Sequence, residues 1–180
     1  ILVKSSQELQ LAIENLLDYN AAISVASTTD RQSVFLDALI RTALTRHQVP
    51  ITQRNLIVKT DLEALKSTVD KAQITSVFSN LISNAVKHSP ERGLLLLTLN
   101  LNDTGKAEFT ISDQGHGVSD AERSKIFEAF FVGEQQIPTT LKGTGLGLSL
   151  VKRYVEAHDG NIECLKPRKG ATFRVTLDVD

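Results

Sequence analysis

Apolar residues recur along the chain at two spacings, and these spacings predict a series of helices and strands. The first 25 residues predict an amphipathic helix, because their seam positions follow one another at steps of four and three residues. Such a helix either packs on the core of its own domain or forms half of an intermolecular bundle. The seam is apolar apart from two polar residues, and consists of Leu2, Ser6, Leu9, Ile13, Leu16, Asn20 and Ile23.

Residues 26–31 are poor in apolar side chains and predict a linker to a globular domain over residues 32–180. Helical spacing returns from Gln32 to about Gln48, and Pro50 is expected to end that helix, since proline disfavours helical backbone in the residue before it. The strongest helical period runs from Lys71 to His88, and the last predicted helix runs from Leu146 to His158.

Strand-like runs separate and follow these helices. Residues 120–130 are predicted to be helical and then irregular, and the polar residues 134–142 to form a mobile flap. The predicted strands are residues 55–60, 94–101, 106–112, 161–166 and 171–179, with turns at 102–105 and 167–170.

The composition is that of one ordinary globular domain, with 180 residues, 41% hydrophobic, 23% charged and a formal net charge of −1. This charge does not support a nucleic-acid or membrane-surface partner. No apolar run approaches the roughly 18–20 residues that span a bilayer. The single cysteine, Cys164, excludes an internal disulfide and is expected to be a buried apolar residue.

Four polar residues share one face of the strongest helix, because Asn80, Asn84, Lys87 and His88 lie at positions i, i+4, i+7 and i+8. Amide oxygens suit a hard cation such as Mg²⁺, and a lysine ammonium adds a positive charge for phosphate. Taken alone, these residues could equally form a solvated polar face.

Two glycine-rich segments complete a possible nucleotide pocket. The first, Asp113-Gln114-Gly115-His116-Gly117-Val118, follows a predicted strand, and its carboxylate could accept a hydrogen bond from the amine of adenine. An ordinary Asp-Gly turn would look the same. The second places alternating glycines before a helix, where backbone can approach a phosphate closely. Its residues are Lys142, Gly143, Thr144, Gly145, Leu146, Gly147 and Leu148.

With Ile126-Phe127-Glu128-Ala129-Phe130-Phe131 between them, these motifs resemble the N box, first glycine box, F box and second glycine box of sensor histidine kinases, in the family's order. The resemblance covers residues 32–180 and the catalytic ATP-binding domain, whose superfamily includes gyrase, MutL and the heat-shock chaperone ATPases. It implies a two-layer α/β sandwich with a mixed, mostly antiparallel sheet, helices on one face, and a flexible lid over ATP.

The resemblance also implies roles for single residues. Asn84 would be the principal Mg²⁺ ligand with Asn80 assisting, and Asp113 would take the adenine amine. The ATP-hydrolysing relatives place a glutamate at the position of Asn80, so slow hydrolysis is expected here. The other residues of the implied ATP site are Lys87, His88, Gly115, Gly117, Val118, Phe131, Lys142, Gly143, Thr144, Gly145, Leu146, Gly147 and Leu148.

The match departs from the family in the F box, where Ala129 replaces a proline and residues 130–133 lack the usual arginine. None of the four histidines lies in the His-Glu/Asp-x-x-x-Pro setting of a phosphoacceptor. We therefore expect the acceptor upstream of Ile1, and no autophosphorylation by this chain alone. His47 is expected at a helix end, His116 exposed, and His158 at a helix C-terminus, where positive charge is favourable.

For the whole protein, the resemblance implies a homodimer in which residues 1–25 form the second dimerisation helix, and a response regulator receiver domain as partner. It also implies a cytoplasmic position for this chain within a bacterial protein anchored in the inner membrane. Contact with nucleic acid or membrane is not expected of the chain itself. Two alternatives stay open: an anti-sigma-type Ser/Thr kinase of the same fold, and a non-catalytic domain that only binds a partner.

Overall fold

The computed structural model describes residues 30–133, 145–167 and 169–180. The predicted helix of residues 1–25, most of the predicted linker and the predicted flap lie outside these residues. Five strands form one sheet in the order β2-β4-β5-β7-β6. β2 runs parallel to β4, and the other neighbours are antiparallel. The strands are β2 (Ile57–Leu62), β4 (Leu94–Leu101), β5 (Ala107–Ser112), β6 (Asn161–Leu165) and β7 (Thr172–Leu177).

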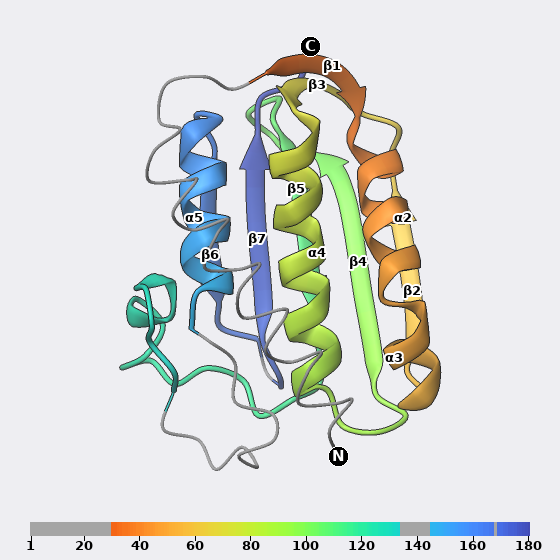
Figure 1. Cartoon of the computed structure of the whole chain (residues 1–180), viewed down its shortest axis with the longest axis vertical. Helices are drawn as coiled ribbons and strands as arrows, with labels where there is room; N and C mark the ends of the chain where they lie inside the picture. The colour runs from red at the N-terminus through yellow and green to blue at the C-terminus, as the bar shows by residue number, and fades with distance from the viewer. Residues whose placement is uncertain (1–29, 134–144, 168) are drawn as a thin grey trace, which may run out of the picture.

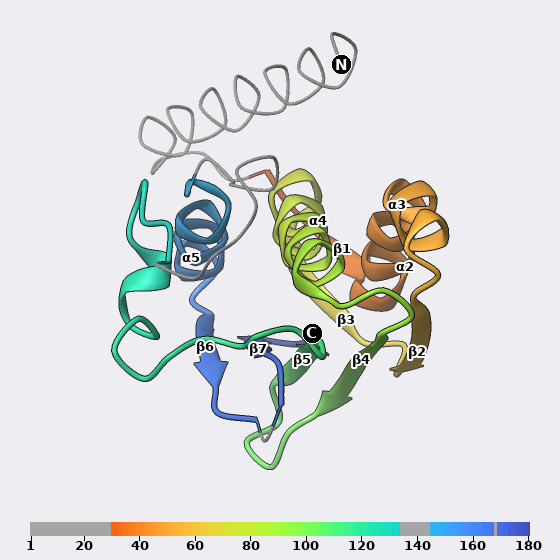
Figure 2. The ribbon, with the colours of Figure 1, turned by 90° about the horizontal axis from the view of Figure 1, so that it is seen from below.

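Helices α2 (Leu36–Arg46), α4 (Lys71–His88) and α5 (Gly147–Ala157) cover one face of this sheet, as Figures 1 and 2 show. Alternate strand residues point toward the helices and are buried, because successive side chains of a strand point to opposite faces. At the centre, the rings of Phe78 on α4 and Phe109 on β5 meet edge to face, with their centroids 4.9 Å apart. The two-layer α/β sandwich with a mixed sheet is therefore confirmed.

A separate two-stranded ribbon, β1 (Arg31–Phe35) with β3 (Lys66–Asp70), lies at the end of the molecule that holds the C-terminus (Figure 1). The prediction of helix for residues 32–35 was wrong, because these residues pair with β3. β3 itself was not predicted. The hydroxyl of Thr68 donates to the Asp180 carboxylate at 2.7 Å, so the C-terminal residue is tied to this ribbon.

Pro50 does not end the helical region as predicted, because a second helix, α3 (Gln48–Gln53), begins after His47. Proline is tolerated there, since the backbone N–H groups of a first helical turn have no partner within the helix. His47 ends α2, as expected. Of the helix predicted within residues 120–130, the structure has only the short 3₁₀ turn η1 (Lys125–Phe127). None of the helices in the described ranges is both long and apolar enough to cross a membrane.

Candidate functional site

The polar face of α4 is positioned by a cap at one end of the helix and by burial of its other faces. Asp70 Oδ1 accepts hydrogen bonds from the backbone N–H groups of Ala72 and Gln73, each at 3.0 Å, which starts the helix at Lys71. Residues between the polar positions, such as Leu81 and Ile82, are fully buried in the core. Asn80, Asn84, Lys87 and His88 are all half-buried on α4, as their spacing predicted.

The two asparagines differ in how they are held. Asn80 Nδ2 donates to the carbonyl oxygen of Ser76 at 3.0 Å, and its Oδ1 faces the start of α5, where a Cβ on Gly147 would lie 2.9 Å away. The side chain of Asn84 makes no hydrogen bond with any described residue, so its amide oxygen has no competing partner among them. Amide oxygens on one face of a helix fit the hard-cation chemistry of Mg²⁺, and Asn84 is the freer of the two.

The last turn of α4 holds two basic side chains whose protonation burial disfavours. Burial lowers the pKa of the Lys87 amine. Burial, together with the charges of Lys87, His116 and Arg54, lowers the pKa of His88 to about 4. His88 is therefore neutral at physiological pH, and its ring nitrogens are available as one hydrogen-bond donor and one acceptor.

Asp113 follows β5 directly and is only 6% exposed. Its Oδ1 accepts hydrogen bonds from the backbone N–H groups of Gly115, at 2.8 Å, and Ala171, at 3.2 Å. Burial raises the pKa of this carboxyl group, and the two hydrogen bonds oppose the shift. No described residue donates to Oδ2, so one oxygen of a fixed carboxylate remains for a ligand.

The glycines of the Asp113 loop are needed because other backbone lies against them. A Cβ on Gly115 would overlap the carbonyl oxygen of His88, which brings the Asp113 loop against the end of α4. Gly117 has φ +78°, and a Cβ there would lie 2.6 Å from the carbonyl oxygen of Gly170. Val118 is half-buried and packs against the core.

The described part of the second glycine motif lies against the F box. The backbone N–H of Phe130 donates to the carbonyl oxygen of Gly145 at 3.0 Å, and Gly145 has φ +71°. A Cβ on Gly145 would lie 2.8 Å from the carbonyl oxygen of Phe131. Leu146 is buried at the start of α5, and Leu148 packs partly against the core.

Residues of all four motifs are thus adjacent in the fold. Asn80 meets Gly147, His88 meets Gly115, and Gly145 meets the F box. Lys142, Gly143 and Thr144 lie outside the described residues. Sequence reasoning missed Gln114, Gly170 and Ala171: Gln114 Oε1 accepts the backbone N–H of Leu94 at 3.0 Å, and the other two hold Asp113. A glycine preceding a strand was the only available signal for the last two.

His158 contradicts the expectation that it favours positive charge at the end of α5. It is 3% exposed, and its Nε2 accepts the backbone N–H of Asp70 at 2.9 Å. Its Nδ1 therefore carries the proton and donates to the carbonyl oxygen of Tyr154 at 2.6 Å. Burial lowers the pKa of this ring, so the neutral form is favoured. Cys164 is buried, as expected, and burial raises the pKa of its thiol to about 11.

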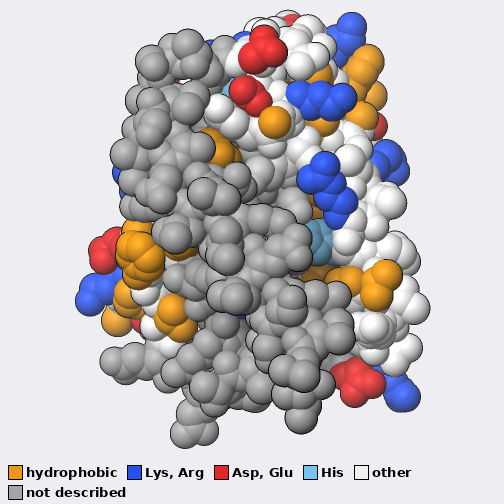
Figure 3. All heavy atoms as spheres, in the orientation of Figure 1, with side chains coloured by type: hydrophobic (Ala, Val, Ile, Leu, Met, Phe, Trp, Pro, Cys, Tyr) orange, Lys and Arg blue, Asp and Glu red, His pale blue; other side chains and the backbone are white. Residues whose placement is uncertain are grey.

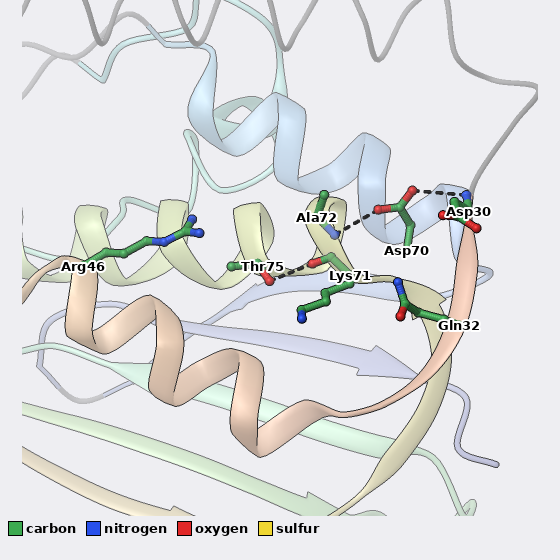
Figure 4. A pocket seen from close by; sticks show the side chains of 7 residues that line it. All are labelled: Asp30, Gln32, Arg46, Asp70, Lys71, Ala72 and Thr75. Carbon is green, nitrogen blue, oxygen red and sulfur yellow. Dashed lines mark hydrogen bonds between the residues drawn. The ribbon is translucent and has the colours of Figure 1, made fainter.

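Two further surface features are a pocket and an exposed apolar patch that includes the side chain of Phe130, whose backbone contacts Gly145. The open pocket of about 530 Å³ lies at the N-terminal end of α4, the end opposite His88. Figure 4 shows the side chains that line it. In the space-filling view of Figure 3, apolar side chains gather over the segment that carries η1, where Phe130 is 64% and Val132 39% exposed. None of the predicted site residues lines the pocket, which is formed by Asp30, Gln32, Arg46, Asp70, Lys71, Ala72 and Thr75.

The amino-acid sequence of this chain is similar to those of known ATPases and sensor kinases. Residues 69–180 match the family described as histidine kinase-, DNA gyrase B-, and HSP90-like ATPase. The sensor histidine kinase GlrK of Escherichia coli is 33% identical over 178 residues, which are 98% of this chain and 37% of GlrK. The sensor-like histidine kinase SenX3 of Mycobacterium tuberculosis is 32% identical over 146 residues, 80% of this chain and 35% of SenX3.

The chain therefore spans about a third of the length of these curated relatives. Among solved structures, the mycobacterial sensor histidine kinase MprB has a TM-score of 0.73 and 28% sequence identity, covering 83% of this chain and 97% of that one. The mixed sheet with helices on one face is the fold of the histidine kinase catalytic domains among these structures. The chain belongs to the histidine kinase-, DNA gyrase B- and HSP90-like ATPase family and is a catalytic ATP-binding domain of the histidine kinase type.

Proposed function

We propose that this chain binds Mg·ATP between α4 and the second glycine motif and presents the γ-phosphate to a histidine elsewhere in a two-component sensor kinase. The observation that carries the proposal is Asp113, a buried carboxylate with one oxygen held by two backbone amides and the other without a described donor. Such an oxygen can accept a hydrogen bond from the amine of adenine. Guanine has a carbonyl at that position, which cannot donate, so the carboxylate oxygen would be left unpaired.

The phosphates would extend from the base toward the start of α5. Asn84 would hold Mg²⁺ with help from Asn80, and the bound ion would neutralise charge on the phosphate oxygens. Lys87 and His88 would contact the phosphates from the last turn of α4. Gly143, Gly145 and Gly147 would let the backbone of the second glycine motif approach the phosphates, together with Lys142, Thr144, Leu146 and Leu148.

Phosphoryl transfer needs an in-line nucleophile, because the protein mainly contributes positioning and charge stabilisation. The acceptor would be a histidine on a dimerisation helix, and a response regulator aspartate would then receive the phosphoryl group. Asn80 cannot remove a proton from water, unlike the glutamate at this position in the ATP-hydrolysing relatives. We therefore propose that hydrolysis of ATP by this chain is slow.

Calorimetric titration of the chain with Mg·ATP, and separately with Mg·GTP, tests the proposal. We expect saturable binding of ATP and much weaker binding of GTP. Absence of saturable binding up to about 1 mM ATP would favour a non-catalytic domain that only binds a partner. Mixing the chain with the histidine-bearing dimerisation segment and labelled ATP then measures transfer in trans. A hydrolysis rate comparable to the ATP-hydrolysing relatives would contradict the role given to Asn80.

A further inference from the structure

The connection between β6 and β7 contacts the loop after β5 at three successive points. The first is at Asp113 itself, whose backbone N–H donates to the carbonyl oxygen of Ala171 at 2.9 Å, while Ala171 N–H donates back to Asp113 Oδ1 at 3.2 Å. Main chain and side chain of Asp113 are thus both held by one residue of this connection. Ala171 lies outside the four motifs.

Gly170 brings the connection close enough for these two hydrogen bonds. It has φ +73°, and a Cβ at this position would overlap the carbonyl oxygen of Asp113 and lie 2.9 Å from Cα of Gln114. These neighbours are backbone atoms, which cannot rotate away as the end of a side chain can. Any residue larger than glycine at position 170 must therefore displace Asp113 or separate the two segments.

Two more contacts extend the pairing along the loop. Gly117 packs against the carbonyl oxygen of Gly170, as described above. Beyond it, Lys166 Nζ forms an ion pair with Asp120 Oδ2 at 2.6 Å. The Lys166–Asp120 pair is largely exposed, so it contributes modestly. The connection nevertheless follows the loop from Asp113 to Asp120 and limits where the carboxylate can lie.

We propose that the β6–β7 connection, through Gly170, Ala171 and Lys166, is a positioning element that sets the affinity and the base selectivity of the nucleotide site. This inference rests on the proposed function, because it assigns Asp113 to the adenine amine. A carboxylate oxygen selects adenine only if it lies at hydrogen-bond distance from the amine, so displacement weakens ATP binding more than GTP binding.

The substitution Gly170→Ala tests this, with Gly105→Ala as the matched control. Gly105 has φ +77°, and nothing lies within 4 Å of a Cβ built on it, so the control imposes the backbone strain without the collision. In calorimetric titrations of the full chain, we expect Gly170→Ala to weaken ATP binding by about tenfold or more and to reduce the ratio of ATP to GTP affinity. Gly105→Ala should keep the wild-type affinity and ratio.

If circular dichroism shows that the Gly170→Ala protein does not fold, a second pair of variants tests the inference. Lys166→Ala should weaken ATP binding by about two- to fivefold, the range that an exposed ion pair supplies. Lys106→Ala removes another exposed ion pair, 2.7 Å long, with Asp178, and should not change ATP affinity. A folded Gly170→Ala protein with the wild-type ratio of ATP to GTP affinity would overturn the inference. If Gly170→Ala does not fold, a Lys166→Ala protein with the wild-type ATP affinity would overturn it. If the wild-type chain itself does not bind ATP, the proposed function fails, and this inference fails with it.

Discussion

At the scale of single residues, Asp113 combines burial with an incomplete set of hydrogen bonds. An ionised carboxylate that is 6% exposed is destabilising unless its oxygens are paired, and only Oδ1 is paired within the described residues. Burial accordingly raises the pKa of this group. Folding would be served as well by a neutral side chain of the same shape, which agrees with the role in ligand binding that we propose for the charge.

Asp113→Asn should therefore separate stability from binding. An amide keeps an acceptor for the N–H groups of Gly115 and Ala171 but can place an NH₂ group against the adenine amine. We expect ATP affinity to fall by about 100-fold or more, because two donors would face each other. The free energy of unfolding in urea at pH 7 should stay the same or rise, since the buried charge is gone.

Asp103→Asn, at an exposed position of the β4–β5 hairpin, is the control for the loss of a carboxylate. It should bind ATP like the wild type. Retention of wild-type ATP affinity by Asp113→Asn would show that the carboxylate does not contact the base. A large loss of stability in that variant would show instead that the charge belongs to the fold.

At the scale of elements, the sequence predicted those parts whose pattern is local and strong. The bounds of α4 and β4 were predicted as observed, because α4 repeats buried residues at helical spacing after the Asp70 cap, and β4 is a continuous apolar run. β1 and β3 were missed because most of their side chains are polar, and their pairing joins residues far apart in the chain. Pro50 was predicted to end the helix before it, although proline is tolerated in the first turn of a new helix.

The candidate site likewise contains residues that could be predicted from the sequence and residues that could not. The motif residues could be predicted because their types and spacing are local. The contact of Ala171 with Asp113 joins residues 58 positions apart, and no local pattern predicts it. His158 was predicted to favour positive charge at the end of a helix. Only the fold places the Asp70 N–H against its ring, and the sequence gives no sign of this contact. Contacts that depend on how α4, α5 and the β6–β7 connection pack needed the structure.

The packing of α4 against α5 leads to a prediction for Gly147. Alanine favours helix over glycine by about 1 kcal/mol, so Gly147→Ala should not destabilise α5 itself. Its Cβ would meet Asn80 Oδ1 at 2.9 Å, and that amide must move. We expect weaker ATP binding with Mg²⁺ present, a smaller effect with EDTA, and little change in melting temperature. Equal effects on ATP binding with and without Mg²⁺ would show that Asn80 does not bind the metal ion.

His158 leads to a second prediction at this scale, because it joins the end of α5 to the start of α4. Replacing it with alanine leaves the backbone N–H of Asp70 without its partner and opens space in a buried position. His158→Ala should lower the free energy of unfolding by about 1–3 kcal/mol, the usual penalty for a buried unpaired group. His116→Ala, at an exposed histidine, is the matched control and should unfold like the wild type. Equal stability of the two variants would mean that the bond to Asp70 contributes nothing.

At the scale of the whole molecule, three histidines make the fold sensitive to acid. Burial lowers the pKa of His47, His88 and His158 from the ordinary value of 6.5. A lower pKa in the folded chain means that the unfolded chain binds protons first as the pH falls. Their contribution to stability is therefore complete above about pH 6.5 and is lost below it. Asp113 acts in the opposite direction, because burial raises its pKa and its protonation favours the folded chain.

Urea unfolding at pH 7.5 and pH 5 should therefore show a lower free energy of unfolding at pH 5. His88, with a pKa of about 4, alone accounts for about 2 kcal/mol of this difference, since each pKa unit corresponds to about 1.4 kcal/mol. His88→Gln should reduce the difference by that amount. Asp113→Asn should enlarge it or leave it unchanged, because the opposing proton uptake is removed. An unchanged pH difference in the His88→Gln variant would show that His88 can be protonated within the fold, because the opposing contribution of Asp113 is the same in both proteins.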